Sequence, residues 1–202
     1  VFGLVGSEMC IRDRVGIDSW FAALVNGATQ VLFAASKRMP ATILRVLQNE
    51  VATAQELLSQ IGIERDTIDI LYMESLSESR PQLCVDSFDL SLGDLQGNKR
   101  QRLFTALDSL AQTRTPIETL VELPANVPYG NISCESKDCT LCMSCVAVCP
   151  TRALHTDGQS PSLKFVEQDC VQCGLCTKAC PENALTMTPR MNWDAAARQS
   201  AT

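Results

Sequence analysis

The sequence predicts an α+β protein in which a small α/β parallel-sheet domain precedes a second, cysteine-rich domain. Between residues 18 and 72, segments with helical and strand patterns alternate with short connections, an order typical of a parallel sheet. Eight of the 11 cysteines lie between residues 139 and 180, in two copies of one motif. With 46% apolar and 20% charged residues, the composition is ordinary for a globular protein.

The first 14 residues, Val-Phe-Gly-Leu-Val-Gly-Ser-Glu-Met-Cys-Ile-Arg-Asp-Arg, belong to no repeat or periodic pattern. They resemble a translated sequencing-adaptor artefact, in which case the natural protein begins upstream of Val15. A natural N-terminal tail is the alternative. In both cases residues 1–14, with Cys10, are left out of the predicted fold.

The domain predicted for residues 15–115 begins with a short helix and a buried strand. Residues 19–26 are predicted to be a helix that ends at Gly27, a residue suited to the end of a helix. Residues 31–35 form a continuous apolar run of strand length. Trp20 and Phe21 are expected in the core of this domain.

A long amphipathic helix and a second strand complete the alternation. Pro40 suits the first turn of a helix, Gly62 ends it, and apolar residues recur between them at steps of three and four: Leu44, Leu47, Val51, Ala54, Leu58 and Ile61. Residues 67–72 are the second strand candidate.

The remainder of this domain and its boundary are less regular. Residues 75–98 are polar and loop-like, and residues 99–112 are predicted to be a further amphipathic helix. Three prolines, Pro116, Pro124 and Pro128, mark residues 116–130 as a linker. Residues 191–202 are expected to be a C-terminal tail.

The cysteine-rich domain, residues 131–190, contains an internal repeat. The sequence Cys-Thr-Leu-Cys-Met-Ser-Cys-Val-Ala-Val-Cys-Pro-Thr-Arg-Ala-Leu starts at Cys139. Its second copy, Cys-Val-Gln-Cys-Gly-Leu-Cys-Thr-Lys-Ala-Cys-Pro-Glu-Asn-Ala-Leu, starts 31 residues later at Cys170. The cysteines, the proline and the Ala-Leu pair recur in register, which predicts a pseudo-two-fold module with one metal centre in each half.

The spacing of the cysteines predicts two [4Fe–4S] clusters. Two-residue gaps let three thiolates surround one face of a cubane cluster, while the fourth cysteine, three residues further and before proline, turns toward the other cluster. Cluster I is therefore expected to bind Cys139, Cys142, Cys145 and Cys180. Cluster II is expected to bind Cys170, Cys173, Cys176 and Cys149.

Other residues near the motifs have simpler expected roles. Pro150 and Pro181 end the cluster-binding stretches, Gly174 lets the backbone approach a cluster, and the Ala-Leu pairs exclude water. The rival metal is structural zinc, which CxxC pairs also bind, but zinc sites rarely need a third cysteine followed by Cys-Pro. The remaining conspicuous residues are expected to bind no metal: Cys134 as a buried strand residue, Cys84 as a small apolar residue and His155 as a surface residue.

Residues 131–190 resemble a bacterial two-[4Fe–4S] ferredoxin domain at every ligand position. The resemblance implies an outer strand pair near residues 132–134 and 185–188 and an inner hairpin near residues 154–156 and 163–166. It also implies a short helix after each cluster loop. The predicted second domain is therefore ferredoxin-like.

The chain also resembles larger redox proteins. Residues 15–72 are loosely similar to the delta subunit domain of methyl-viologen-reducing hydrogenases, and residues 15–202 to central parts of 4Fe–4S proteins associated with formate dehydrogenases. These resemblances imply a fragment of a longer protein. The delta domain's own cluster is not carried over, because residues 15–72 contain no cysteine.

Charge and cysteine usage limit the partners and the compartment. A formal charge of −6 disfavours nucleic acid and anionic membranes and suits a redox partner with a basic docking face, although acidity also serves solubility. The most apolar stretch, residues 21–35, is too short and polar to span a bilayer. Cysteines that bind metal must not form disulfides, so the predicted location is the reducing cytoplasm.

The predicted function is electron transfer through two clusters by a ferredoxin-like segment of a larger cytosolic redox protein, with dehydrogenase or hydrogenase subunits as partners. No catalytic residue is assigned, because four cysteines per cluster leave no iron open to substrate. The alternative is a fragment of an iron–sulfur oxidoreductase, associated with formate dehydrogenase or hydrogenase, whose catalytic part lies outside this sequence. In a third interpretation the clusters only hold the fold together.

Overall fold

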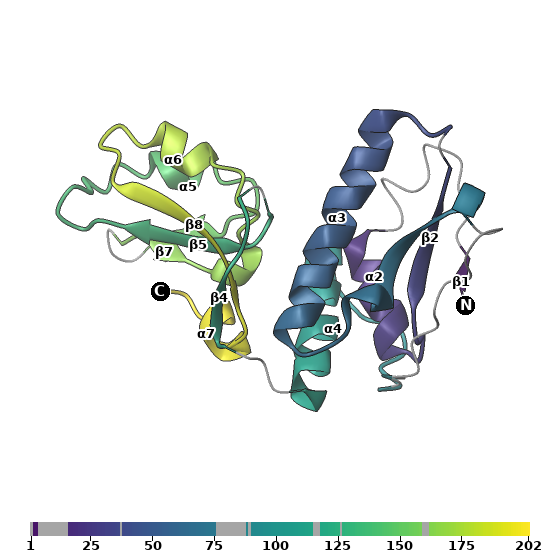
Figure 1. The fold of residues 1–202 in the computed structure, drawn as a ribbon. Coiled ribbons are helices and arrows are strands. Elements are labelled where there is room, and N and C mark those ends of the chain that lie inside the picture. The colour runs from purple at the N-terminus through teal and green to yellow at the C-terminus, as the bar shows by residue number, and fades with distance from the viewer. Residues whose placement is uncertain are drawn as a thin grey trace. The chain divides into compact units, whose positions relative to one another are not determined.

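The computed structural model describes residues 2–3, 16–36, 38–75, 88, 90–114, 118–125, 127–158 and 162–202. The chain divides into two compact units, Val1–Ile117 and Glu118–Thr202. Each unit is described by itself below (Figure 1).

The N-terminal unit contains a parallel sheet in the order β1-β2-β3. Its elements are β1 (Phe2–Gly3), α2 (Ile17–Val25), β2 (Val31–Ala35), α3 (Ala41–Gln60), β3 (Ile68–Tyr72) and α4 (Lys99–Thr113). The two longer strands pair in parallel, with Val31 opposite Ile68 and Ala35 opposite Tyr72. The helices, strands and parallel pairing expected from the sequence are thus confirmed. Residues 2–3 differ from the expectation, because β1 pairs with β2 although residues 1–14 were left out of the predicted fold.

The core of this unit joins α2 to the sheet and to α4. Trp20 and Phe21 are fully buried, as expected, and the Trp20 ring lies 4.4 Å from that of Phe33 on β2. The buried carboxylate of Asp18 forms an ion pair with Arg102 of α4 at 2.7 Å. Asn98 and Gln101 form a reciprocal capping box, which fixes the start of α4 at Lys99.

The C-terminal unit contains two small antiparallel sheets, β4-β8-β5 and β6-β7. Its elements are β4 (Leu120–Glu122), β5 (Gly130–Cys134), α5 (Ser144–Ala147), β6 (Leu154–His155), β7 (Lys164–Phe165), α6 (Leu175–Ala179), β8 (Leu185–Asn192) and α7 (Ala195–Gln199). The outer strand pair, the inner hairpin and the two short helices expected from the sequence are all present.

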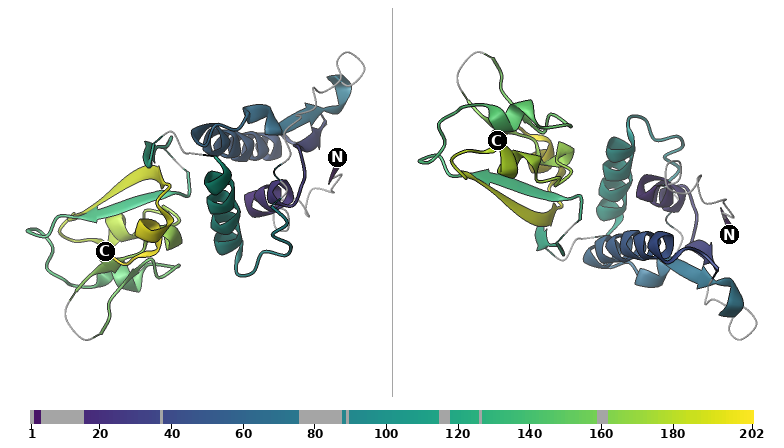
Figure 2. Two further views of the ribbon diagram at one scale, coloured as in Figure 1. Left: turned by 90° about the horizontal axis from the view of Figure 1, so that it is seen from below. Right: turned by 90° about the horizontal axis from the view of Figure 1, so that it is seen from above.

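The strand pairing interlocks the two copies of the motif. The half of the unit that contains the first copy runs from β5 through α5 to β6, and the half that contains the second runs from β7 through α6 to β8. However, β5 pairs with β8 and β6 pairs with β7, so each sheet combines a strand from each half. The pairing of β5 with β8 is visible as the green and yellow arrows lying side by side in Figures 1 and 2.

Both flanks of the cysteine-rich segment belong to this unit. Part of the predicted linker forms β4, which pairs with the end of β8. The predicted tail continues β8 to Asn192 and then forms α7, and the backbone of Thr202 exchanges two hydrogen bonds with Phe165. Met191 and Trp193 are buried, and the removal of their apolar surface from water favours packing of these flanks onto the unit.

None of the helices in the described part of the chain has the length and apolar character needed to cross a membrane.

Candidate functional site

The eight cysteines of the repeat line two separate hollows in the C-terminal unit. The first hollow, about 370 Å³ including the open space at its mouth, is lined by Cys139, Cys142, Cys145 and Cys180. The second hollow, about 330 Å³ on the same measure, is lined by Cys149, Cys170, Cys173 and Cys176. Each hollow thus takes three cysteines from one copy of the motif and the fourth from the other copy.

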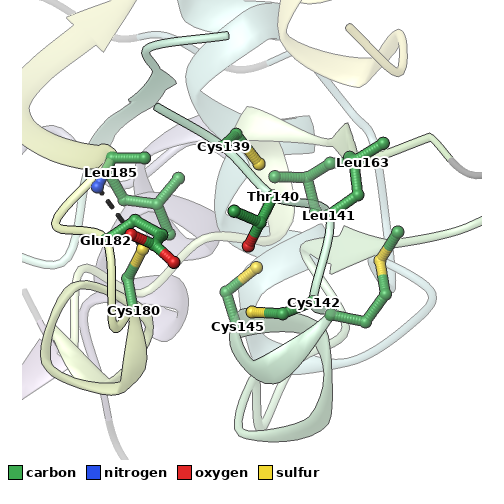
Figure 3. Close-up of a pocket in the computed structure, with 11 residues that line it drawn as sticks. Cys139, Thr140, Leu141, Cys142, Cys145, Leu163, Cys180, Glu182 and Leu185 are labelled. Carbon is green, nitrogen blue, oxygen red and sulfur yellow. Dashed lines mark hydrogen bonds between the residues drawn. The ribbon is translucent and has the colours of Figure 1, made fainter. Parts of the chain in front are cut away.

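Figure 3 shows the first hollow, with the first-copy cysteines on one side and Cys180 on the other, next to Glu182. The backbone N–H of Ala184 donates a hydrogen bond to Cys180 Sγ at 3.4 Å. In the first copy, burial would raise the pKa of Cys149, but hydrogen bonds from the Leu154 backbone and from Thr151 lower it overall. The fourth cysteine of each copy is therefore held by hydrogen bonds from the residues that follow it.

The cysteine loops repeat an uncommon backbone conformation at three positions. Left-handed φ angles occur at Leu141 and Gln172 (54° and 52°), at Met143 and Gly174 (60° and 72°), and at Arg152 and Asn183 (60° and 51°). The members of each pair are 31 residues apart, so the conformation follows the repeat rather than the side chain. Alternation of right- and left-handed residues forms concave nests of backbone N–H groups that suit anions, including iron–sulfur centres.

The innermost thiols are costly to ionise without a positive partner. Burial raises the pKa of the Cys176 thiol to about 11, and burial also raises the pKa of Cys145. By contrast, hydrogen bonds from Ser144 lower the pKa of the exposed Cys142. Iron binds thiolates, and its positive charge compensates the desolvation of buried sulfur. The donor set of each hollow, four soft sulfur ligands, fits a [4Fe–4S] cluster.

Apolar side chains separate the sulfur atoms from water on the inner side. Ile132, Phe165 and the two Ala-Leu pairs, Ala153-Leu154 and Ala184-Leu185, are all buried around the cysteines. The expected role of the Ala-Leu pairs as apolar packing is consistent with this burial. A surrounding of low dielectric strengthens the effect of each hydrogen bond made to a cluster ligand.

The structure shows where two of the residues that were expected to bind no metal, Cys134 and His155, lie. Cys134 lies on β5, as expected, but it is exposed rather than buried, because it occupies the last position of the strand. Although the residue is exposed, partial desolvation of its sulfur and a hydrogen bond with Cys139 raise its pKa to about 11. His155 is half-buried on β6. Cys10 and Cys84 lie outside the described residues.

In the described part of the chain, no three Cys, His, Asp or Glu side chains form a group able to hold a single metal ion.

Several polar side chains at the hollows were missed by the sequence analysis. Gln172 donates to Cys170 Sγ at 3.3 Å, Ser144 Oγ lies 3.4 Å from Cys142 Sγ, and Thr151 Oγ1 lies 3.8 Å from Cys149 Sγ. Glu182 lines the first hollow. A comparison of the two motif copies would have identified them, because all four occur where the copies differ.

Comparison with protein families finds a match over part of the chain. Residues 138–184 match the family described as "4Fe-4S dicluster domain", a range that includes all eight cysteines of the two hollows. No match was found among the curated proteins. The match supports an iron–sulfur, ferredoxin-like domain that binds 4Fe–4S clusters and indicates iron–sulfur electron transfer.

Proposed function

We propose that the C-terminal unit holds two [4Fe–4S] clusters and transfers electrons, one at a time, between redox proteins. The observation that carries this proposal is the division of eight cysteines into two sets of four, each set around its own hollow. A bound cluster of this type supplies a centre that gains and loses one electron. The protein supplies the ligands, the hydrogen bonds and the exclusion of water.

In this proposal the ligand sets are crossed. Cys139, Cys142 and Cys145 hold cluster I together with Cys180, and Cys170, Cys173 and Cys176 hold cluster II together with Cys149. The lining of the two hollows supports this assignment. The strand pairing supports it too, because β5 with β8 brings the end of the second copy to the start of the first, and β6 with β7 brings the end of the first copy to the start of the second. Crossed ligands also place the two clusters in one interlocked unit, which suits electron exchange between them.

The segment has no catalytic site of its own in this proposal. Four cysteine ligands saturate each cluster and leave no iron position for a substrate. Partners are redox proteins, and the resemblances of residues 15–202 favour subunits of a dehydrogenase or a hydrogenase. The alternative function is a part of an iron–sulfur oxidoreductase associated with formate dehydrogenase or hydrogenase. A cytoplasmic location belongs to the proposal, because eight thiolates must stay reduced before the clusters assemble.

Metal and sulfide analysis of the full chain, reconstituted without oxygen, tests this proposal. We expect about eight iron and about eight sulfide per chain, with sulfur-to-iron charge-transfer absorption that bleaches on reduction and returns on oxidation. About two zinc per chain and no such absorption would contradict it. Clusters that are present but cannot be reduced reversibly would instead support a purely structural role.

A further inference from the structure

Gln172 belongs to the second cysteine loop but also contacts the outer sheet. Its side-chain Nε2 donates to Cys170 Sγ at 3.3 Å and to the carbonyl oxygen of Asn131, on β5, at 3.4 Å. Cys170 is buried, with 8% of its surface exposed. The amide therefore donates to a buried ligand sulfur of the second hollow.

The surroundings of Gln172 fix which end of its amide faces the sulfur. Both atoms near Nε2, a thiol sulfur and a carbonyl oxygen, accept hydrogen bonds, so a flipped amide would place oxygen against two acceptors. Oε1 is buried and has no hydrogen-bond partner among the described residues. Leaving Oε1 without a partner is unfavourable, which indicates that the interactions of Nε2 hold the side chain in this position.

Gly130 makes room for this arrangement. A Cβ atom at residue 130 would collide with the carbonyl oxygen of Thr188 and would lie 2.7 Å from Cδ of Gln172. The side chain of Gln172 thus packs where any other residue at position 130 would place its own. Glycine at the start of β5 therefore serves two neighbours, the backbone of β8 at Thr188 and the side chain of Gln172, although glycine by itself lowers the stability of a strand.

The first copy of the motif lacks this donor. The residue 31 positions before Gln172 is Leu141, an aliphatic side chain with 40% of its surface exposed. Hydroxyl groups occur at both hollows, Ser144 and Thr140 beside Cys142 in the first and Thr151 beside Cys149 in the second, so a hydroxyl donor is not what the first hollow lacks. The amide of Gln172 thus gives the second hollow a side-chain N–H donor at the position where the first hollow has an aliphatic side chain.

Reduction adds negative charge to a cluster and its sulfur ligands, and burial opposes that charge. The second hollow is the more buried one, since both Cys170 and Cys176 are buried whereas Cys139 and Cys145 are only partly so. A hydrogen bond to a ligand sulfur strengthens as that sulfur becomes more negative, and it therefore favours the reduced form. Gln172 thus opposes the effect of burial on cluster II.

We propose that Gln172 is a positioning residue that raises the reduction potential of cluster II against the effect of burial, and so shifts the distribution of an electron between the two clusters toward cluster II. This inference rests on the proposed function, because it requires both clusters to be bound. It assigns to the polar side chain of one loop a role in directing electrons within the module. The residue neither ligates iron nor transfers an electron itself.

The test is a potentiometric titration of Gln172→Met, followed by electron paramagnetic resonance. Methionine has a similar length and fills the space beside Gly130, but it has no N–H donor. The signals are first assigned through Cys142→Ala and Cys173→Ala, which remove one ligand of cluster I and one of cluster II. We expect the midpoint of cluster II to fall, so that its reduced fraction relative to its oxidised fraction drops about tenfold at the wild-type midpoint, or about 59 mV. The midpoint of cluster I should not move.

Iron and sulfide content, measured on each sample before titration, separates the two possible failures. Wild-type protein without about eight iron and about eight sulfide contradicts the proposed function itself. A fully loaded Gln172→Met protein with an unchanged midpoint of cluster II overturns only the role of Gln172. If Gln172→Met loads poorly, Gln172→Leu provides the same test with the side chain that the first copy holds at Leu141. Equal shifts of both clusters would also overturn the inference, because they would indicate a general change in the fold.

Discussion

The two copies of the cysteine motif share a backbone and differ in the side chains that surround it. Three left-handed residues recur in register in each loop, and in each copy the fourth cysteine lines the hollow of the other. By contrast, Leu141 corresponds to Gln172, Met143 to Gly174, and Thr151 to Glu182. The shared features place ligands, which both hollows need equally. The differing side chains adjust charge and hydrogen bonding, in which the hollows can differ without losing a ligand.

The largest expected effect comes from removing the fourth cysteine of either copy, which is proposed to bind the cluster of the other copy. Cys149→Ala removes a thiolate that lies within the first motif, yet we expect it to disrupt the same electron paramagnetic resonance signal as Cys173→Ala. Cys180→Ala should likewise disrupt the signal lost in Cys142→Ala. Each change should remove up to about half of the iron, because one of two cubane clusters loses a ligand.

Cys134→Ala is the matched control for these variants. Cys134 lies close to Cys139 but belongs to neither set of four, and iron content should stay at the wild-type level. If Cys149→Ala and Cys142→Ala disrupted the same signal, each motif would close on its own cluster. The crossed assignment would then be wrong.

A smaller effect is expected from substitutions at Gly174 and Met143, which occupy the same left-handed position in the two copies. Gly174→Ala introduces a Cβ with no atom nearer than 3.9 Å, so its cost comes from the φ angle of 72° and not from a clash. A left-handed L-residue costs about 1–2 kcal/mol, which predicts roughly fivefold or faster loss of cluster absorption in denaturant without oxygen. Met143→Gly removes the same strain from the first copy and should slow the loss, or leave it unchanged, because glycine also favours the unfolded chain. Equal destabilisation by both variants would show that the side chain of Met143, not the backbone, is what the first loop requires.

The smallest expected effect concerns the charge at Glu182. Its carboxylate lines the first hollow, where a negative charge disfavours reduction, so Glu182→Gln should raise the midpoint of cluster I. Because Glu182 is exposed, water and salt screen it, and we expect a shift of less than about 59 mV that shrinks as ionic strength rises. Cluster II provides the internal control in the same titration. A shift of cluster II equal to that of cluster I would indicate a change in net charge rather than a local effect.

In the N-terminal unit, local sequence patterns were enough to predict the main helices and strands. The boundaries of β2 follow from a continuous apolar run, and α3 from apolar residues at helical spacing between Pro40 and Gly62. Both elements are long enough, or apolar enough, for their own sequence to determine them. In the C-terminal unit, the inner and outer strand pairs were implied by the resemblance to two-[4Fe–4S] ferredoxin domains and are present, and the repeat identified the eight cysteines that line the two hollows.

Other features became visible only in the tertiary structure. The three residues of β4 and the five of α7 carry too little local pattern to be recognised. β4 pairs with β8, and Arg198 of α7 donates to Gln168 and to the carbonyl oxygen of Asn192, so both elements depend on partners outside themselves. The exposure of Cys134 and the contact of Gln172 with Asn131 likewise depend on how β5 meets β8 and the second loop. Sequence by itself determined which atoms can bind iron, since ligand chemistry resides in the side chain. Which hydrogen bonds reach those atoms was decided by the tertiary structure, because their donors come from strands and loops that only folding brings together.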